Sequence, residues 1–150
     1  MAARWSAVGL VAVLALAGAG CGGSKSPSEE YAARVSSMCE DFAKREQKIG
    51  QPAGPDDLAA RGDRIVAAFE EAILRPLREL EAPPELATEA AQLRTLTRQQ
   101  DTLLRGLAAA GKRGDLGAVR RLVVQNAQVN AQAGQIADRL GAESCTSAAG

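Results

Sequence analysis

The chain has no histidine among its 150 residues, and its aromatic side chains are limited to one tryptophan, one tyrosine and two phenylalanines. The lack of histidine excludes zinc sites built on histidine, di-iron sites of the Glu-x-x-His type, and catalysis that uses histidine as a general base. No glycine-rich loop that could cradle a phosphate is present. We therefore expect a protein that is not an enzyme and that carries no metal or cofactor.

The charge is balanced, with 18 basic and 18 acidic residues. Such a chain lacks the positive field that draws proteins to nucleic acids. The scarcity of aromatic residues also leaves little with which to stack bases. We expect no nucleic acid among the partners.

An uncharged segment, residues 7–20, follows a single basic residue, Arg4, and ends at Cys21. A basic start, an apolar run of about 7–15 residues and small residues before the cleavage point are typical of a secretory signal. The apolar stretch 7–19 is shorter than the roughly 20 residues that a transmembrane helix needs. We expect residues 1–20 to be a signal peptide.

Residues 16–21, Leu-Ala-Gly-Ala-Gly-Cys, resemble the lipobox of bacterial lipoproteins, although Gly18 stands where an aliphatic residue is usual. The resemblance implies that Cys21 becomes N-terminal and carries lipid, including palmitate. Residues 21–26 would then be the lipidated cysteine and a flexible tether, holding the protein on the extracytoplasmic face of the cell membrane. The alternatives are simple secretion and an uncleaved signal anchor.

The other two cysteines, Cys39 and Cys145, form an even pair once Cys21 is set aside. Exported proteins normally pair their cysteines in an oxidising compartment. A bridge between them is feasible only if the chain after Gly141 doubles back along the preceding helix. The sequence predicts a disulfide, and the alternative is two free buried cysteines.

Helix signals run through the rest of the chain, without any alternating strand pattern. A capping-box sequence begins at Ser26, Asp115 is placed to cap the last helix, and Gly50 and Gly141 are placed to end helices. Apolar residues recur every three to four positions, as on the buried face of a helix. The sequence predicts four helices, at about 27–49, 56–81, 84–110 and 116–140.

Four long helices with short connections predict an all-α, up-down-up-down four-helix bundle closed by one disulfide. Pro76 lies inside the second helix, where it removes a backbone donor and predicts a kink. We expect one domain at 27–145, followed by a disordered tail at 146–150.

Polar residues interrupt the apolar stripes of the last two helices. A tight turn near residue 113 would set Gln100 opposite Asn126 and Thr97 opposite Asn130. This layer is either a pocket for a small polar ligand or ordered water, or a self-satisfied hydrogen-bond layer that fixes helix register.

Basic residues gather at the end of the bundle away from Cys21. Such a basic distal cap could contact an anionic envelope polymer or a partner protein. The alternative is an ordinary solvated surface that complements helix dipoles. The residues of the basic distal cap are Lys44, Arg45, Lys48, Lys112, Arg113, Arg120 and Arg121.

From the mature N-terminus to Cys145, the chain resembles small alanine- and arginine-rich helical lipoproteins of high-GC bacteria such as actinobacteria. The resembling features are Tyr31, Cys39, the junction 82–86, Gly114-Asp115, and Leu140-Gly141 leading to Cys145. The resemblance implies a location in the cell envelope but little about activity, since such proteins are mostly uncharacterised.

We expect a membrane-tethered, non-catalytic binding or structural module. The first alternative is a carrier that holds a small ligand in the layer of Thr97, Gln100, Asn126 and Asn130. The second alternative is an enzyme, which no sequence feature predicts.

Overall fold

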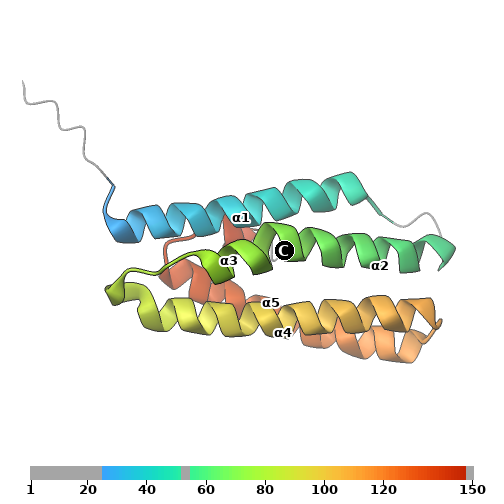
Figure 1. Ribbon diagram of the computed structural model, residues 1–150. Helices are drawn as coiled ribbons and strands as arrows, with labels where there is room; N and C mark the ends of the chain where they lie inside the picture. The colour runs from blue at the N-terminus through green and yellow to red at the C-terminus, as the bar shows by residue number, and fades with distance from the viewer. Residues whose placement is uncertain (1–24, 52–54, 148–150) are drawn as a thin grey trace, which may run out of the picture.

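The computed structural model describes residues 25–51 and 55–147, and all regular secondary structure in these ranges is helical (Figure 1). The predicted all-α class, with four long helical segments, is confirmed. Residues 1–24, which include the expected signal peptide, Cys21 and most of the tether, lie outside the described residues. The elements are α1 (Pro27–Ile49), α2 (Pro55–Phe69), the π-helical turn η1 (Glu70–Leu74), α3 (Arg75–Glu79), the 3-10 turn η2 (Pro84–Leu86), α4 (Ala87–Lys112), α5 (Leu116–Arg139) and α6 (Ser144–Ser147).

The start and end of α1 follow the predicted capping signals. The backbone N–H of Glu29 donates to the Ser26 hydroxyl at 3.2 Å, and the Ser26 N–H donates to the Glu29 carboxylate at 2.7 Å. These two bonds form a capping box, and hydrogen bonding by Ser26 to the carboxylate, chiefly from its backbone N–H, holds the pKa of Glu29 below its usual value. Gly50 ends the helix with φ of 71°, a conformation that favours glycine.

A π-helical turn, η1, links α2 to α3 immediately before Pro76. The N–H of Arg75 donates to the carbonyl of Glu70, one residue further back than in an α-helix. Because Pro76 has no N–H, the series of backbone hydrogen bonds of an α-helix lacks one bond at Pro76. The sequence predicted a kink here, and that kink stays a prediction; the local feature that the structure describes is the π turn.

Arg94 of α4 completes the end of α3. Its Nε donates to the carbonyl of Leu77 at 3.2 Å, and its Nη2 donates to the carbonyl of Leu80. The last carbonyls of a helix have no partner within the helix. Arg94 therefore fastens the C-terminus of α3 to α4.

The turn between α4 and α5 lies near residue 113, as predicted. Helix α4 continues about two residues beyond the predicted end, through Gly111 to Lys112, and the positive φ of 68° falls at Gly114. A single glycine costs a helix only about 1 kcal/mol, so Gly111 does not end it. Asp115 caps α5 as predicted, since its side chain accepts the N–H of Ala118 at 2.9 Å.

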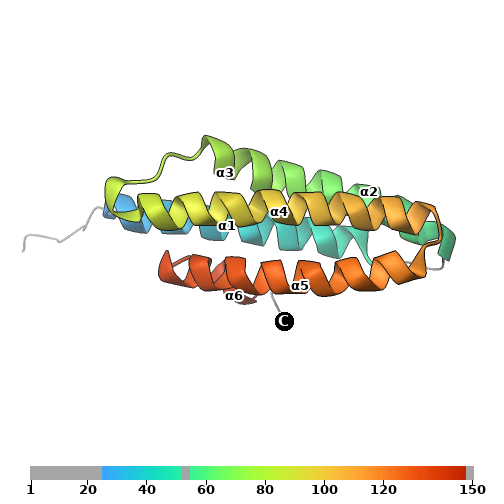
Figure 2. The same cartoon turned by 90° about the horizontal axis from the view of Figure 1, so that it is seen from below.

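The four long segments lie side by side, with α4 next to α5 along its length (Figures 1 and 2). Helix α4 packs against both α2 and α5, and α1 packs against α2. In contrast, direct packing of α1 against α5 is sparse, and the short α6 contacts both of them. The buried cluster that joins the elements consists of Tyr31, Val35, Leu77, Ala90, Leu93, Ala133, Ile136, Ala137, Leu140 and Ala142.

The chain reverses after α5, as the predicted disulfide required. Gly141 has φ of 76°, and the N–H of Ala142 returns to the carbonyl of Ala137 at 2.8 Å. The Sγ atoms of Cys39 and Cys145 lie 1.96 Å apart, which is a disulfide bond. The predicted pairing is confirmed, and it ties α1 to α6.

The expected disordered tail at 146–150 needs correction. Helix α6 extends to Ser147, so positions 146 and 147 are helical. The turn is held at its start, because the Cys145 N–H donates to the carbonyl of Ala142 at 3.1 Å and the Cys145 side chain is bonded to Cys39. Residues 148–150 lie outside the described residues. No helix within 25–51 or 55–147 has the length and apolar character needed to cross a membrane.

Tyr31 gives the buried cluster an unusual polar atom. Its residue is 2% exposed, and its hydroxyl has no hydrogen-bond partner among the described residues. Burial raises the pKa of Tyr31, while the nearby charge of Arg94 acts in the opposite direction. The hydroxyl is therefore a buried group whose ionisation the fold opposes.

We predict that Tyr31→Phe will change how stability depends on alkaline pH. Because the pKa is raised in the folded state, the stabilisation is complete below the unfolded value of about 10 and is lost as the pH rises through the folded value. Removing the unpaired hydroxyl should leave the free energy of unfolding equal or higher by up to about 1 kcal/mol at pH 7. Urea unfolding at pH 8 and 10.5 should show a smaller alkaline loss in the variant. Equal losses in both proteins would contradict the assignment.

Candidate functional site

A cavity of about 230 Å³ lies inside the bundle, with residues of α1, α2, η1, α3, α4 and α5 in its wall. Most of the lining is apolar, as in ligand pockets of proteins generally. Phe42 and Phe69 meet edge to face in this wall, with ring centroids 5.4 Å apart. Other apolar lining residues are Val35, Met38, Leu93 and Leu104.

The four residues of the predicted polar layer all line this cavity. Gln100 Nε2 donates to Asn130 Oδ1 at 3.0 Å, which joins α4 to α5. Thr97 is 3% exposed, and its hydroxyl donates to the carbonyl of Leu93 in its own helix at 2.8 Å. Asn126 differs from the other three, because its buried Oδ1 has no hydrogen-bond partner among the described residues.

The pairing within this layer differs from the one expected. Gln100 was expected opposite Asn126, but it bonds to Asn130, one helical turn further along α5. The extended Gln100 side chain reaches this partner, so the residue opposite it in the helix pair is not the one to which it bonds. As a result, the expected Thr97–Asn130 pair is also absent, and Asn126 is left without the partner predicted for it.

The disulfide forms part of the same wall. Cys39 and Cys145 both line the cavity, on the side where α1 and α5 have few direct contacts. Among the described residues of the lining, Glu46 is the one with an ionisable side chain, since the two cysteines are bonded to each other. No group of three or more Cys, Asp or Glu side chains within 25–51 and 55–147 is arranged to hold a metal ion.

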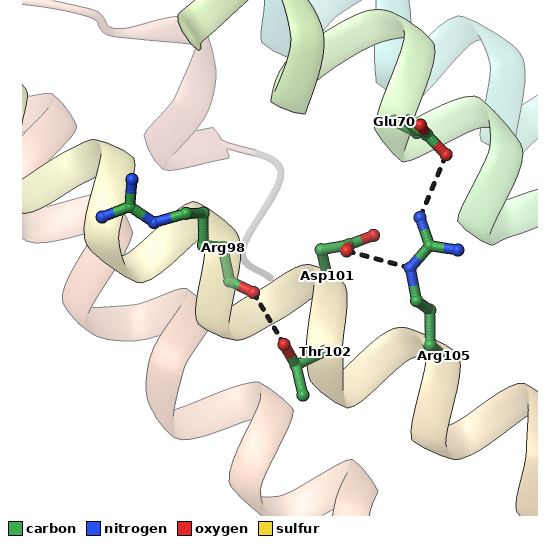
Figure 3. A network of polar contacts seen from close by, with 5 residues as sticks. All are labelled: Glu70, Arg98, Asp101, Thr102 and Arg105. Atoms are coloured by element: carbon green, nitrogen blue, oxygen red, sulfur yellow. Dashed lines mark hydrogen bonds and ion pairs between the residues drawn. The ribbon is translucent and has the colours of Figure 1, made fainter.

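Charged contacts position η1 on the outside of this cavity. Arg105 of α4 donates from Nη2 to Glu70 at 3.0 Å and from Nε to Asp101 at 2.9 Å (Figure 3). The hydrogen bonds that Arg105 donates to these two carboxylates raise its pKa, and Asp101 has the larger effect. The same view shows the Thr102 hydroxyl donating to the carbonyl of Arg98 within α4.

A matching contact holds the other side of η1. Arg45 of α1 donates to Glu71 at 2.7 Å and to Asp41 at 2.9 Å. The two neighbouring acidic residues of η1 therefore bind arginines of two different helices. Such exposed pairs add little free energy, but together they fix where η1 sits between α1 and α4. Sequence reasoning missed this arrangement, although an Asp-x-x-x-Arg spacing occurs in both helices.

The basic distal cap is partly neutralised by acidic neighbours. Lys44 lies 4.0 Å from Glu40, and Lys112 lies 2.8 Å from Asp63. Arg45 is directed to Glu71 in η1 rather than to an open surface. Within the described part of the chain, no ion pair involves Lys48, Arg113, Arg120 or Arg121. Three of the seven residues of the basic distal cap therefore have acidic partners, and the cap itself stays a prediction.

Substitution of Asn126 and Asn130 distinguishes the two roles proposed for the polar layer, a ligand pocket and a hydrogen-bond layer that fixes helix register. Asn126→Leu removes an unpaired acceptor, so the free energy of unfolding should rise by about 1 kcal/mol. Asn130→Leu leaves Gln100 without its partner and should lower that free energy by about 1–3 kcal/mol. Urea unfolding of both variants is the measurement. A loss of stability in Asn126→Leu would show that Asn126 itself fixes helix register.

Comparison with known proteins gave no match: no protein family, no curated protein and no solved structure is significantly similar to this chain. Function must therefore be inferred from the sequence pattern and from the cavity and its lining.

Proposed function

We propose that this chain is a bacterial lipoprotein, tethered to the extracytoplasmic face of the cell membrane through lipid on Cys21, that acts as a non-catalytic binding or structural helical module. The observation that carries the proposal is the pairing of its cysteines. Two of the three are bonded to each other, which leaves Cys21, at the end of a lipobox-like segment, as the odd one.

The disulfide supports a location outside the cytoplasm. Disulfides persist in oxidising compartments and are rare where thiols are kept reduced. The Cys39–Cys145 bond closes a long loop, since the two residues are separated by 106 in the sequence numbering. A bond of this kind fits a protein exported by the signal that residues 1–20 resemble.

We further infer an up-down-up-down order of the four long segments, with a bend of the second segment near Pro76. The short connections between successive segments support this order. The π turn before Pro76 supports the bend, since π turns and prolines are both recognised causes of helix bending.

A second candidate function is that of a carrier for a small ligand. The observation that favours it is the cavity of about 230 Å³, which is mainly apolar and contains the unpaired Asn126 Oδ1. A layer that served only to fix register would satisfy all of its own hydrogen bonds. The Gln100–Asn130 pair meets that description, and Asn126 does not.

The basic residues at the distal end offer a separate contact for a partner. Arg113, Arg120 and Arg121 are exposed around the start of α5, and an anionic envelope polymer or an acidic protein surface would complement them. This contact would be weak and dependent on salt concentration, because exposed charges are screened.

Intact mass of the protein purified from its native membrane tests the lipoprotein proposal. We expect a mass that lacks residues 1–20 and includes diacylglycerol on Cys21, with the two extra hydrogens of a reduced disulfide after treatment with a thiol. Cys21→Ala is the matched control, and it should retain the signal and carry no lipid. An unlipidated mass for the unmodified chain would contradict the proposal.

A further inference from the structure

We propose that the cavity binds an uncharged amphiphile, a molecule with a short aliphatic body and one hydrogen-bond donor that is directed at Asn126 Oδ1. This inference rests on the carrier function proposed above and specifies the ligand class for the same cavity. Three features of the cavity support it: the unpaired Asn126 Oδ1, the size and chemistry of the lining, and the few contacts between α1 and α5.

The ligand must carry a hydrogen-bond donor. Asn126 Oδ1 is a buried acceptor without a partner among the described residues. Neither neighbouring amide is bonded to this oxygen, since Gln100 donates to Asn130 instead. Thr97 is likewise committed, since its hydroxyl donates to Leu93. A hydroxyl or N–H from a ligand would satisfy the free oxygen and remove the penalty of its burial.

The body of the ligand must be small and apolar. The lining includes Val35, Met38, Phe42, Phe69, Leu93 and Leu104. The volume of about 230 Å³ is below the roughly 300–1,000 Å³ of typical ligand pockets, which favours a short ligand. An unbranched chain of this size would bury most of its surface against the two phenylalanine rings and the aliphatic residues.

The lining disfavours a charged head group. It contains no lysine or arginine that could neutralise an anion. Its single carboxylate, on Glu46, lies 4.0 Å from Arg61 and so already has a cation nearby. A charge without a partner in a mainly apolar cavity is strongly unfavourable. The ligand class that fits is therefore neutral.

The side between α1 and α5 provides the route of entry. These helices have little direct packing, and α6 with its disulfide covers the part of the gap near the end of α5.

Two isomers with eight non-hydrogen atoms test the inference on the full chain. The first, 1-heptanol, has a hydroxyl donor, whereas 1-methoxyhexane has the same composition and no donor. Calorimetric titration and the shift in melting temperature measure their binding. We expect 1-heptanol to bind about tenfold more tightly than the ether, as one added hydrogen bond predicts. Heptanoate should bind more weakly than 1-heptanol.

The variant Asn126→Leu should remove the preference, so that both isomers bind with equal affinity. The matched control is Gln128→Leu, an exposed position on the same helix, which should retain the tenfold difference. If the two isomers bind the unmodified protein equally, the assignment of a donor to Asn126 is wrong and the carrier function stands. If no probe binds at all, the carrier function itself is wrong. Tighter binding of heptanoate would overturn the neutral ligand class.

Discussion

The disulfide between Cys39 and Cys145 is the constraint on which the closed form of the bundle depends. Helices α4 and α2 pack directly, as do α4 and α5, whereas the backbones of α1 and α5 approach each other at few positions, although both helices contribute side chains to the buried cluster. The last side of the bundle is closed instead by α6, which the disulfide ties to α1. The disulfide holds α6 against α1, and α6 in turn contacts α5. The covalent bond thus connects α1 and α5 where their own backbones approach each other at few positions. The cavity and its open side follow from that separation.

The interior consists of two parts with different character. The end of the bundle that contains Tyr31 and Leu140 is a buried cluster in which small alanines, Ala90 and Ala137, allow the helices to approach closely. Beyond Leu93, polar residues enter the core, where the Gln100–Asn130 pair joins α4 to α5. Close packing thus gives rigidity to one part, and an unpaired acceptor remains in the other.

Much of the fold could be predicted from the sequence because its signals are local. The capping box at Ser26 and the glycine at position 141 reflect chemistry within a few residues, and the parity of the cysteines predicted the long-range disulfide. The end of α4 could not be predicted as well, since glycines at 111 and 114 both suggest a break and only Gly114 has a positive φ. The cavity was foreseen only as a layer of polar residues. The contacts that Glu70 and Glu71 of the π turn make with distant helices are likewise not revealed by periodicity.

Hydrogen exchange of the backbone amides, with the disulfide intact and after reduction, tests the central claim most directly. If α6 and its bond hold α5 to α1, reduction should speed exchange in residues 142–147 and in the last turns of α5, while the interface of α2 with α4 stays protected. Unchanged exchange across α6 after reduction would contradict the claim. An equal increase in all helices would contradict it as well, because the disulfide would then stabilise the whole fold rather than this one side.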